Sequence, residues 1–230
     1  MICKSKCVVL SSRKYSESSK ILNVYSKDFG KLTLMAKGAF SPKSKFLGMV
    51  EMLNSIEAEF YFKQNREMHT LSNADADIRF KNIKNDIDLS TASMICCELV
   101  NKTQNIGETN EEIYFDLIET FKIIDSGIVF LSTLKFINKI ISHLGYALVN
   151  NADINLPFTY FDFQKGNLNN VSGVRLSESE AKVFQAIFDD ENITKDIEKN
   201  DFIKIYNSLI RFLKIHLDRN ITLNSIELLN

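Results

Sequence analysis

The side chains best placed to bind a charged ligand are the lysines and arginines of the first fifty positions. Residues 1–50 hold ten of them against two acidic residues, Glu17 and Asp28, a local charge of +8. The rest of the chain holds 18 basic and 27 acidic residues, a charge of −9, so the net charge of −1 hides a basic head on an acidic body. This asymmetry indicates that the head meets a polyanion. Charge alone leaves a second interpretation open, in which the lysines keep exposed strands soluble and protect sheet edges.

Aromatic residues are interleaved with these cations. A nucleic-acid strand requires cations along a groove and exposed flat side chains on which its bases stack. The aromatic candidates are Tyr15, Tyr25, Phe29, Phe40 and Phe46. Phe40 and Phe46 flank the Pro-Lys-Ser-Lys run at 42–45 in a predicted loop, so they are the aromatics least needed by a core. The predicted contact set is Arg13, Lys14, Lys20, Lys31, Lys37, Phe40, Lys43, Lys45 and Phe46.

Motifs of catalytic and metal sites are missing from the sequence. It contains no phosphate-binding G-x-x-x-x-G-K-[ST] loop, no G-x-G-x-x-G, no H-E-x-x-H and no G-x-S-x-G. The three histidines, His69, His143 and His216, are isolated from one another. We therefore expect no enzyme activity.

The four cysteines do not form a metal site by their spacing. Cys3 and Cys7 lie on one predicted strand, where four residues separate Cα atoms by about 13 Å, too far to share a tetrahedral metal. Cys96 and Cys97 are adjacent on a predicted helix and point in different directions. We expect all four to be ordinary small buried residues, and we expect no bound metal.

Five strand-like segments occupy the basic head, at 3–10, 20–26, 31–37, 52–62 and 67–71. In the third, Leu32, Leu34 and Ala36 alternate with polar or long side chains, as in a half-buried strand. Five short strands in about 75 residues favour a small barrel, with the five-stranded OB-fold as the economical candidate. An open sheet and an SH3-like barrel are the competing interpretations.

Helical periodicity begins after residue 76. Helices are predicted at 78–87, 91–102, 113–125, 128–144 and 177–188, and a last long one carries Phe202 to Leu217. Gly145 ends the fourth helix, and residues 146–175 lose periodicity. The predicted fold is α+β, with a barrel over 1–78 and an all-α region over 79–230 that contains an irregular segment at 146–175. The absence of an apolar run of about 18 residues or an apolar leader predicts a cytoplasmic protein without a membrane span.

Several blocks of the head resemble a known family. They are KYSESSKIL at 14–22, DFGKL at 28–32, AKGA at 36–39, PKSKF at 42–46 and EMHTL at 67–71. In this order and spacing the chain resembles the bacterial RecO family of DNA repair and recombination mediators, densely over 1–75. Weaker support follows in Glu98-Leu99 and in His143-Leu144-Gly145-Tyr146.

This resemblance implies an N-terminal OB-fold, an α-helical C-terminal region and a protein associated with the nucleoid. It implies binding of single- and double-stranded DNA, annealing of complementary strands, and loading of the RecA recombinase onto strands coated by single-strand-binding protein (SSB). RecR and the acidic C-terminal tail of SSB are the implied partners. A receptor for that tail needs an apolar pocket beside cations. Arg211 and Lys214, with Phe212 and Leu213 nearby, are one candidate, and Lys135 and Lys139 are another.

The chain departs from the family in one respect. Many members carry a four-cysteine zinc module soon after the L-G-Y sequence, whereas residues 147–230 contain no cysteine. We therefore predict no zinc and no other cofactor. An adaptor whose barrel docks a partner protein, and whose lysines only solubilise it, is the alternative function. A nuclease ranks last, because the basic head has only Glu17 and Asp28 as possible metal ligands.

Overall fold

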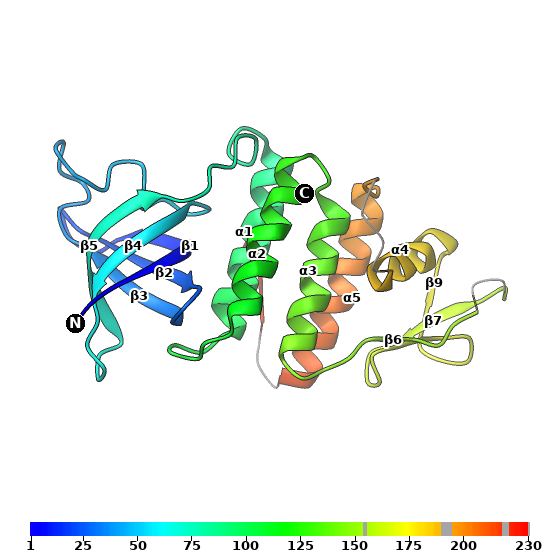
Figure 1. Ribbon diagram of the computed structural model, residues 1–230. Helices are drawn as coiled ribbons and strands as arrows, with labels where there is room; N and C mark the ends of the chain where they lie inside the picture. Colours follow the sequence, from blue (N-terminus) through cyan, green and yellow to red (C-terminus); the bar gives the residue numbers. More distant parts are fainter. Residues whose placement is uncertain (154–155, 190–194, 218–220, 230) are drawn as a thin grey trace. The chain divides into compact units, whose positions relative to one another are not determined.

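The computed structural model describes residues 1–153, 156–189, 195–217 and 221–229 (Figure 1). Five strands come first, three helices follow, and four short strands precede the last two α-helices. The elements are β1 (Ile2–Lys14), β2 (Lys20–Ser26), β3 (Gly30–Ala36), β4 (Ser55–Tyr61), β5 (Met68–Ala76), α1 (Ile87–Thr103), α2 (Glu111–Asp125), α3 (Phe130–His143), β6 (Val149–Asn150), β7 (Thr159–Asp162), β8 (Asn167–Asn169), β9 (Val174–Leu176), α4 (Glu178–Phe188), α5 (Lys199–Leu217) and the short 3-10 helix η1 (Asn224–Leu229).

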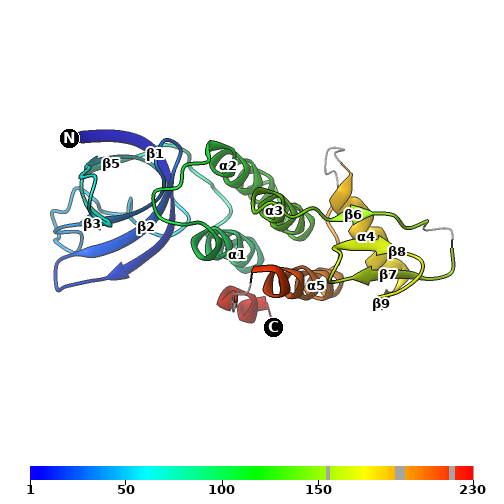
Figure 2. The same cartoon turned by 90° about the horizontal axis from the view of Figure 1, so that it is seen from below.

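The first five strands close into a barrel in the order β1-β2-β3-β5-β4 (Figure 2). The long β1 pairs with β2 and with β4, and its register with β2 shifts between Val9 and Ser11. Such a bulge bends a strand, which lets β1 serve both neighbours. A short parallel pairing of β3 with β5 closes the ring. The predicted fold class, a five-stranded barrel of OB type ahead of a helical region, is confirmed.

Alternation along the strands creates the barrel core. On β3, Leu32, Leu34 and Ala36 are buried while the residues between them are half-buried. They pack with inward-facing side chains of the other strands, among them Cys7 and Phe60. All four cysteines are free and buried, as the sequence predicts.

Two helices cover part of the outer surface of the barrel. Val8 and Leu10 on β1 and Tyr25 on β2 are buried although they lie outside the barrel core, because α1 and α2 pack against β1 and β2. The Tyr25 hydroxyl donates to the Asn110 carbonyl oxygen at 3.0 Å. Met1–Asp125 and Ser225–Asn230 accordingly form one compact unit, and Ser126–Asn224 form the other. The predicted boundary after residue 78 marks the change from strands to helices, not the division between these units.

The helix predicted over 78–87 is wrong. Residues 77–86 form a connection with turns, and α1 begins at Ile87. The Asp125 carboxylate accepts the backbone N–H groups of Lys81, Asn82 and Ile83, at 2.7 to 3.0 Å. These three N–H groups therefore bind a side chain at the end of α2, and they are not used in the backbone hydrogen bonds of a helix.

The second unit is built around α3 and α5, which lie side by side, with α4 packed against both (Figures 1 and 2). No side chain of its own caps the start of α3; instead Asp196 accepts the N–H groups of Val129, Phe130 and Leu131. A capping box of Ser177 and Glu180 begins α4, within the helix predicted over 177–188.

The segment expected to be irregular, 146–175, carries most of a small sheet. Its order is β6-β8-β7-β9, with β9 ending at Leu176. Phe161 and Leu168 are buried, and Phe161 stacks on Phe184 of α4 at 4.7 Å between ring centroids. These strands have two to four residues, which is too short for an alternating pattern, so the sequence did not predict them.

Within the described ranges, no helix is both long and apolar enough to cross a membrane. Among those residues, no three histidine, cysteine or acidic side chains gather as metal ligands would. The absence of zinc and of other cofactors stays a prediction.

Candidate nucleic-acid interface

The ends of β1, β2 and β3 bring lysines together at one edge of the barrel. Lys14 lies opposite Lys20 in the β1–β2 ladder, and Lys20 lies opposite Ala36, directly before Lys37. Like charges placed directly opposite each other destabilise a ladder. Glu51 offsets part of this repulsion, because its carboxylate accepts from the Lys20 ammonium at 2.6 Å. Lys20 is thereby held in place, with only 13% of its side chain exposed.

Phe40 supplies a flat face between these cations. Its backbone N–H donates to the Ser18 carbonyl oxygen at 3.2 Å, which fixes the loop after β3 against the loop between β1 and β2. The Lys20 ammonium lies 5.1 Å and the Lys14 ammonium 5.9 Å from the ring centroid. Phe40 as a residue is 44% exposed. An exposed ring flanked by two ammonium groups can stack on a base while the lysines contact its phosphates.

The loop that follows Phe40 carries two more exposed lysines on a buried anchor. Lys43 and Lys45 are exposed, in a run of turns closed by backbone hydrogen bonds such as that from Ser44 N–H to Ser41 O, at 2.9 Å. The prediction that Phe46 is free for stacking is wrong, because the ring is 2% exposed and belongs to the barrel core. Phe46 holds the loop in place. The exposed apolar residue of the loop is Leu47, which the sequence analysis did not single out.

The remaining aromatic candidates, Tyr15, Tyr25 and Phe29, also differ in exposure. Tyr15 is exposed beside Lys14, whereas Tyr25 is buried under the helices. Phe29 packs edge-on against Phe60, with ring centroids 5.4 Å apart. Phe40 and Tyr15 are therefore the two of the five candidates that a nucleic acid can reach.

Lys31, a predicted contact residue, has a structural role instead. Its ammonium donates to the carbonyl oxygens of Asn101 and Gln104, the latter at 3.1 Å, at the C-terminal end of α1. A cation at this position complements the helix dipole and satisfies free carbonyl groups. Burial lowers the pKa of Lys31. Its engagement with α1 corrects the expectation that it contacts nucleic acid.

We call the remaining set the cationic face. Its members are Arg13, Lys14, Lys20, Lys37, Phe40, Lys43 and Lys45. Except for Lys20, its basic side chains are exposed and form no ion pair with any described residue. This set therefore comprises five exposed basic side chains without an ion pair, the paired Lys20 and one accessible ring.

A second basic groove, not found from the sequence, lies on the β4–β5 hairpin. Tyr61, Lys63, Arg66, Met68 and Thr70 line a depression of about 300 Å³. Tyr61 is exposed at the end of β4. The sequence signal that could have revealed it is a tyrosine at the end of a predicted strand, followed within five residues by Lys63 and Arg66.

The residues predicted to receive an acidic tail lie in the second unit. Lys135 is half-buried on α3, and its ammonium donates to the Asp189 carbonyl oxygen at the end of α4. Lys139 is exposed on the same helix. On α5, Arg211 and Lys214 are exposed.

The apolar residues expected beside Arg211 are not available. Phe212 and Leu213 are buried, so they cannot line a surface pocket, and this part of the prediction is corrected. The apolar neighbours that the structure offers are Phe163, whose ring lies 4.5 Å from the Arg211 guanidinium carbon, and the exposed Ile215.

Two of the three histidines, His69 and His216, contact backbone groups. His69 is buried, and its Nδ1 accepts the Lys63 N–H at 3.4 Å. Burial lowers the pKa of His69. The two ring nitrogens of His216 lie within hydrogen-bond distance of the Phe212 and Gln164 carbonyl oxygens. These contacts place both rings in structural roles.

Comparison with known proteins gives relatives for the barrel and for the whole chain. A family profile described as "Recombination protein O N terminal" matches residues 1–77. A protein described as DNA repair protein RecO from Clostridium acetobutylicum is 29% identical over 147 residues, 63% of this chain and 59% of the relative. One of the same description from Prosthecochloris aestuarii is 38% identical over 74 residues, 32% of this chain and 28% of the relative.

A further relative matches nearly end to end. The protein of that description from Alkaliphilus metalliredigens is 24% identical over 245 residues, 99% of this chain and 98% of the relative. Against the relatives from Clostridium and Pelotomaculum, the chain spans just over half of their length, 59% and 56%. The resemblance to the RecO family is confirmed.

Proposed function

We propose that this chain, with its confirmed resemblance to the RecO family, acts in DNA repair and homologous recombination by binding DNA on the cationic face. The observation that carries the proposal is the exposed Phe40 side chain, with the ammonium groups of Lys14 and Lys20 at 5.9 and 5.1 Å from its ring centroid. The basic side chains contact phosphates, and the ring stacks on a base whatever its identity. The protein therefore binds single and double strands without selecting a sequence.

The mechanism that follows is non-catalytic and needs no cofactor. Two strands held on basic surfaces repel each other less, so complementary strands pair more readily. The groove at Tyr61, Lys63 and Arg66 offers a second basic surface on the same barrel. In this scheme the protein anneals strands and, with RecR, helps RecA to load onto strands coated by SSB.

The helical unit is the proposed receptor of the acidic SSB tail. Arg211 and Lys214 are exposed beside Phe163 and Ile215, so cations and apolar side chains adjoin. Replacing Arg211 and Lys214 by glutamate should abolish binding of a tail peptide, measured by calorimetry. Lys182→Glu reverses one charge at an exposed position of α4 and should leave binding intact. Unchanged affinity of the Arg211/Lys214 variant would exclude this site.

The experiment that tests DNA binding uses the full chain and a labelled single strand of about 30 nucleotides. We expect Phe40→Ala to weaken binding at least fivefold in fluorescence anisotropy, because loss of one stacked base costs about 1–3 kcal/mol. Phe115→Ala is the matched control. Phe115 is also exposed and also has an ammonium over its ring, that of Lys27 at 5.1 Å, but it lies on α2.

A protein adaptor is the alternative function, and the same titration separates the two. An adaptor whose barrel docks a partner shows no affinity for DNA even at low salt, and DNA is retained only after the partner is added. Equal affinities of the wild type, Phe40→Ala and Phe115→Ala would also reject the proposed face.

A further inference from the structure

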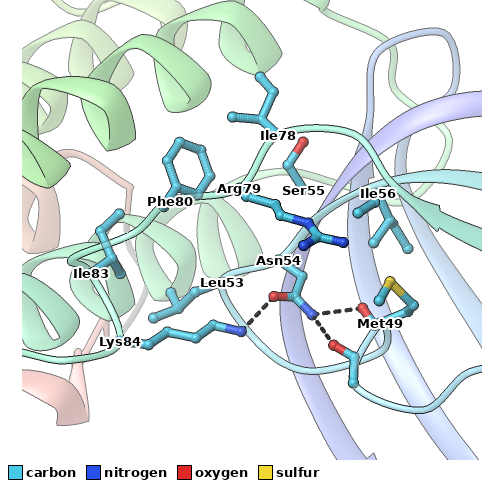
Figure 3. A pocket seen from close by; sticks show the side chains of 12 residues that line it. Met49, Leu53, Asn54, Ser55, Ile56, Ile78, Arg79, Phe80, Ile83 and Lys84 are labelled. Carbon is cyan, nitrogen blue, oxygen red and sulfur yellow. Dashed lines mark hydrogen bonds between the residues drawn. The ribbon is translucent and has the colours of Figure 1, made fainter.

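A cavity of about 210 Å³ lies within the first unit, beside the loop that carries Lys43 and Lys45. One wall comes from residues 48–56, which continue that loop, and the other from residues 76–84, which follow β5. Much of the lining is apolar: Met49, Leu53, Ile56, Phe80 and Ile83 (Figure 3). A dry cavity of about 150 Å³ holds a benzene ring, so this volume suits one nucleobase.

The polar side chains Asn54 and Arg79 of the cavity differ in whether they already have partners within the protein. Asn54 is committed, because its amide donates to the carbonyl oxygens of Gly48 and Met49, both at 2.8 Å, and its side-chain oxygen accepts from Lys84 (Figure 3). Arg79 is exposed, and within the described residues its guanidinium has no ion pair or side-chain hydrogen bond. In Figure 3 it extends between Asn54 and Ile56. A guanidinium in this position is a donor for one anionic group.

The backbone of this wall is strained. Leu53 has a φ of +71°, the single positive value among the described residues other than glycine. Two backbone hydrogen bonds hold it there, from Leu53 N–H to Val9 O at 3.0 Å and from Val9 N–H to Asn54 O at 2.9 Å. A non-glycine residue held in this region costs about 1–3 kcal/mol, and such strain clusters at binding sites.

Side-chain contacts connect the cavity to the cationic face. Lys20, which lies beneath the Phe40 ring, pairs with Glu51. Glu51 belongs to residues 48–56, which form one wall of the cavity, and in the same wall Asn54 accepts from the Lys84 ammonium. The segment that pairs with Lys20 is therefore also the segment that lines the cavity.

We infer that the cavity takes one nucleotide that has left the base stack of a bound single strand. Its base packs among Leu53, Phe80 and Ile83, and its phosphate contacts Arg79. Because the Asn54 side chain already has hydrogen-bond partners in the protein, it does not select among bases. The apolar walls therefore accept any base, as sequence-independent binding requires. This inference rests on the proposed function, and it adds a second base-binding position to the Phe40 ring.

Two substitutions test the inference in the full chain, with equilibrium binding to a thymidine 30-mer as the measurement. Ala76→Leu fills the cavity from an exposed position of its lining and changes no charge. Arg79→Gln removes the free guanidinium, and Lys81→Gln is its matched control, an exposed cation two residues away that does not line the cavity. We expect about tenfold weaker binding for Ala76→Leu and for Arg79→Gln, and less than twofold for Lys81→Gln.

A strand without bases identifies what the cavity holds. With abasic sites along the 30-mer, wild type and Ala76→Leu should bind equally, because the base that the cavity accepts is missing. Should Ala76→Leu and Arg79→Gln both match the wild type on the thymidine strand, while Phe40→Ala binds weakly, the cavity inference is overturned and the proposed function stands. If Ala76→Leu instead weakens only the binding of an acidic peptide with an aromatic side chain, the cavity is a peptide site and the inference is again overturned. No DNA binding by the wild type would reject the proposed function itself.

Discussion

The salt dependence of DNA binding follows from the number of free charges on the cationic face. Arg13, Lys14, Lys37, Lys43 and Lys45 are exposed and form no ion pair with any described residue. Each phosphate neutralised on a single strand contributes about 0.7 to the slope of log affinity against log salt, so five contacts give a slope of about −3.5. Affinity should then fall about 100-fold between 50 and 200 mM salt.

Removal of two of these charges should change the slope by a known amount. The double variant Lys43→Gln with Lys45→Gln leaves three free cations, a slope of about −2.1 and a loss of about 20-fold over the same salt range. Anisotropy titrations at four or five salt concentrations measure both slopes.

The control is a second pair of lysines on the same barrel. Lys4 and Lys6 on β1 are ion-paired to Glu57 at 2.8 Å and to Asp77 at 2.7 Å, so they are not free to neutralise phosphates. Lys4→Gln with Lys6→Gln should leave the slope at about −3.5. If both double variants reduce the slope equally, net charge and not the geometry of the face governs binding, and the reasoning is refuted.

Three further predictions concern the framework of these sites, each read from urea unfolding. Gly30→Ala should cost more than about 2 kcal/mol, because Gly30 has a φ of +61° and a Cβ would overlap the Glu108 carbonyl oxygen. Gly107→Ala, with a φ of +80° and open space, should cost about 1 kcal/mol, and equal losses would contradict the clash. Asp196→Ala should cost about 2 kcal/mol by leaving three N–H groups of α3 uncapped, whereas Asp196→Asn should cost less; no loss for the alanine variant would show that the cap is dispensable. The pKa of Asp125 is lowered, because burial, which raises it, is outweighed by the N–H groups of Asn82, Ile83 and Lys81. The contribution of Asp125 to the free energy of unfolding is therefore full above its unfolded pKa of about 4, and it is lost as the pH falls through the lower folded pKa. The stability difference between wild type and Asp125→Ala should shrink over that acidic range, and a constant difference would exclude the linkage.

Local patterns predicted the strands of the barrel well. The strand Lys20–Ser26 has the predicted bounds, and Gly30–Ala36 is displaced by one residue from the predicted 31–37. In Gly30–Ala36 buried side chains alternate with half-buried ones, and this period records which face meets the core, whereas Lys20–Ser26 was predicted by its strand-forming residue types. The helix prediction over 78–87 failed because a distant residue decides the structure of this segment. Its periodicity is helical, but Asp125, about forty positions away, binds its N–H groups.

In the candidate site, too, the sequence predicted residue types and positions, whereas contacts with distant residues decided which of them are exposed. The sequence identified Phe40 and Phe46 as one pair in one loop, yet one ring is exposed and the other is in the core. It identified Lys31 by charge, whereas two carbonyl groups of α1 engage that ammonium. Neither distinction is visible in composition or spacing, because it depends on partners distant in the chain.

The sequence by itself determined the basic character of the first fifty residues, the strand periods of the barrel and the blocks that resemble the RecO family. The tertiary structure decided which charges are free, which ring is exposed, and that Leu53 and Arg79 meet at one cavity. The physical reason is that charge and periodicity are local properties of a chain. Exposure, ion pairing and cavities are set by contacts between residues that only folding brings together.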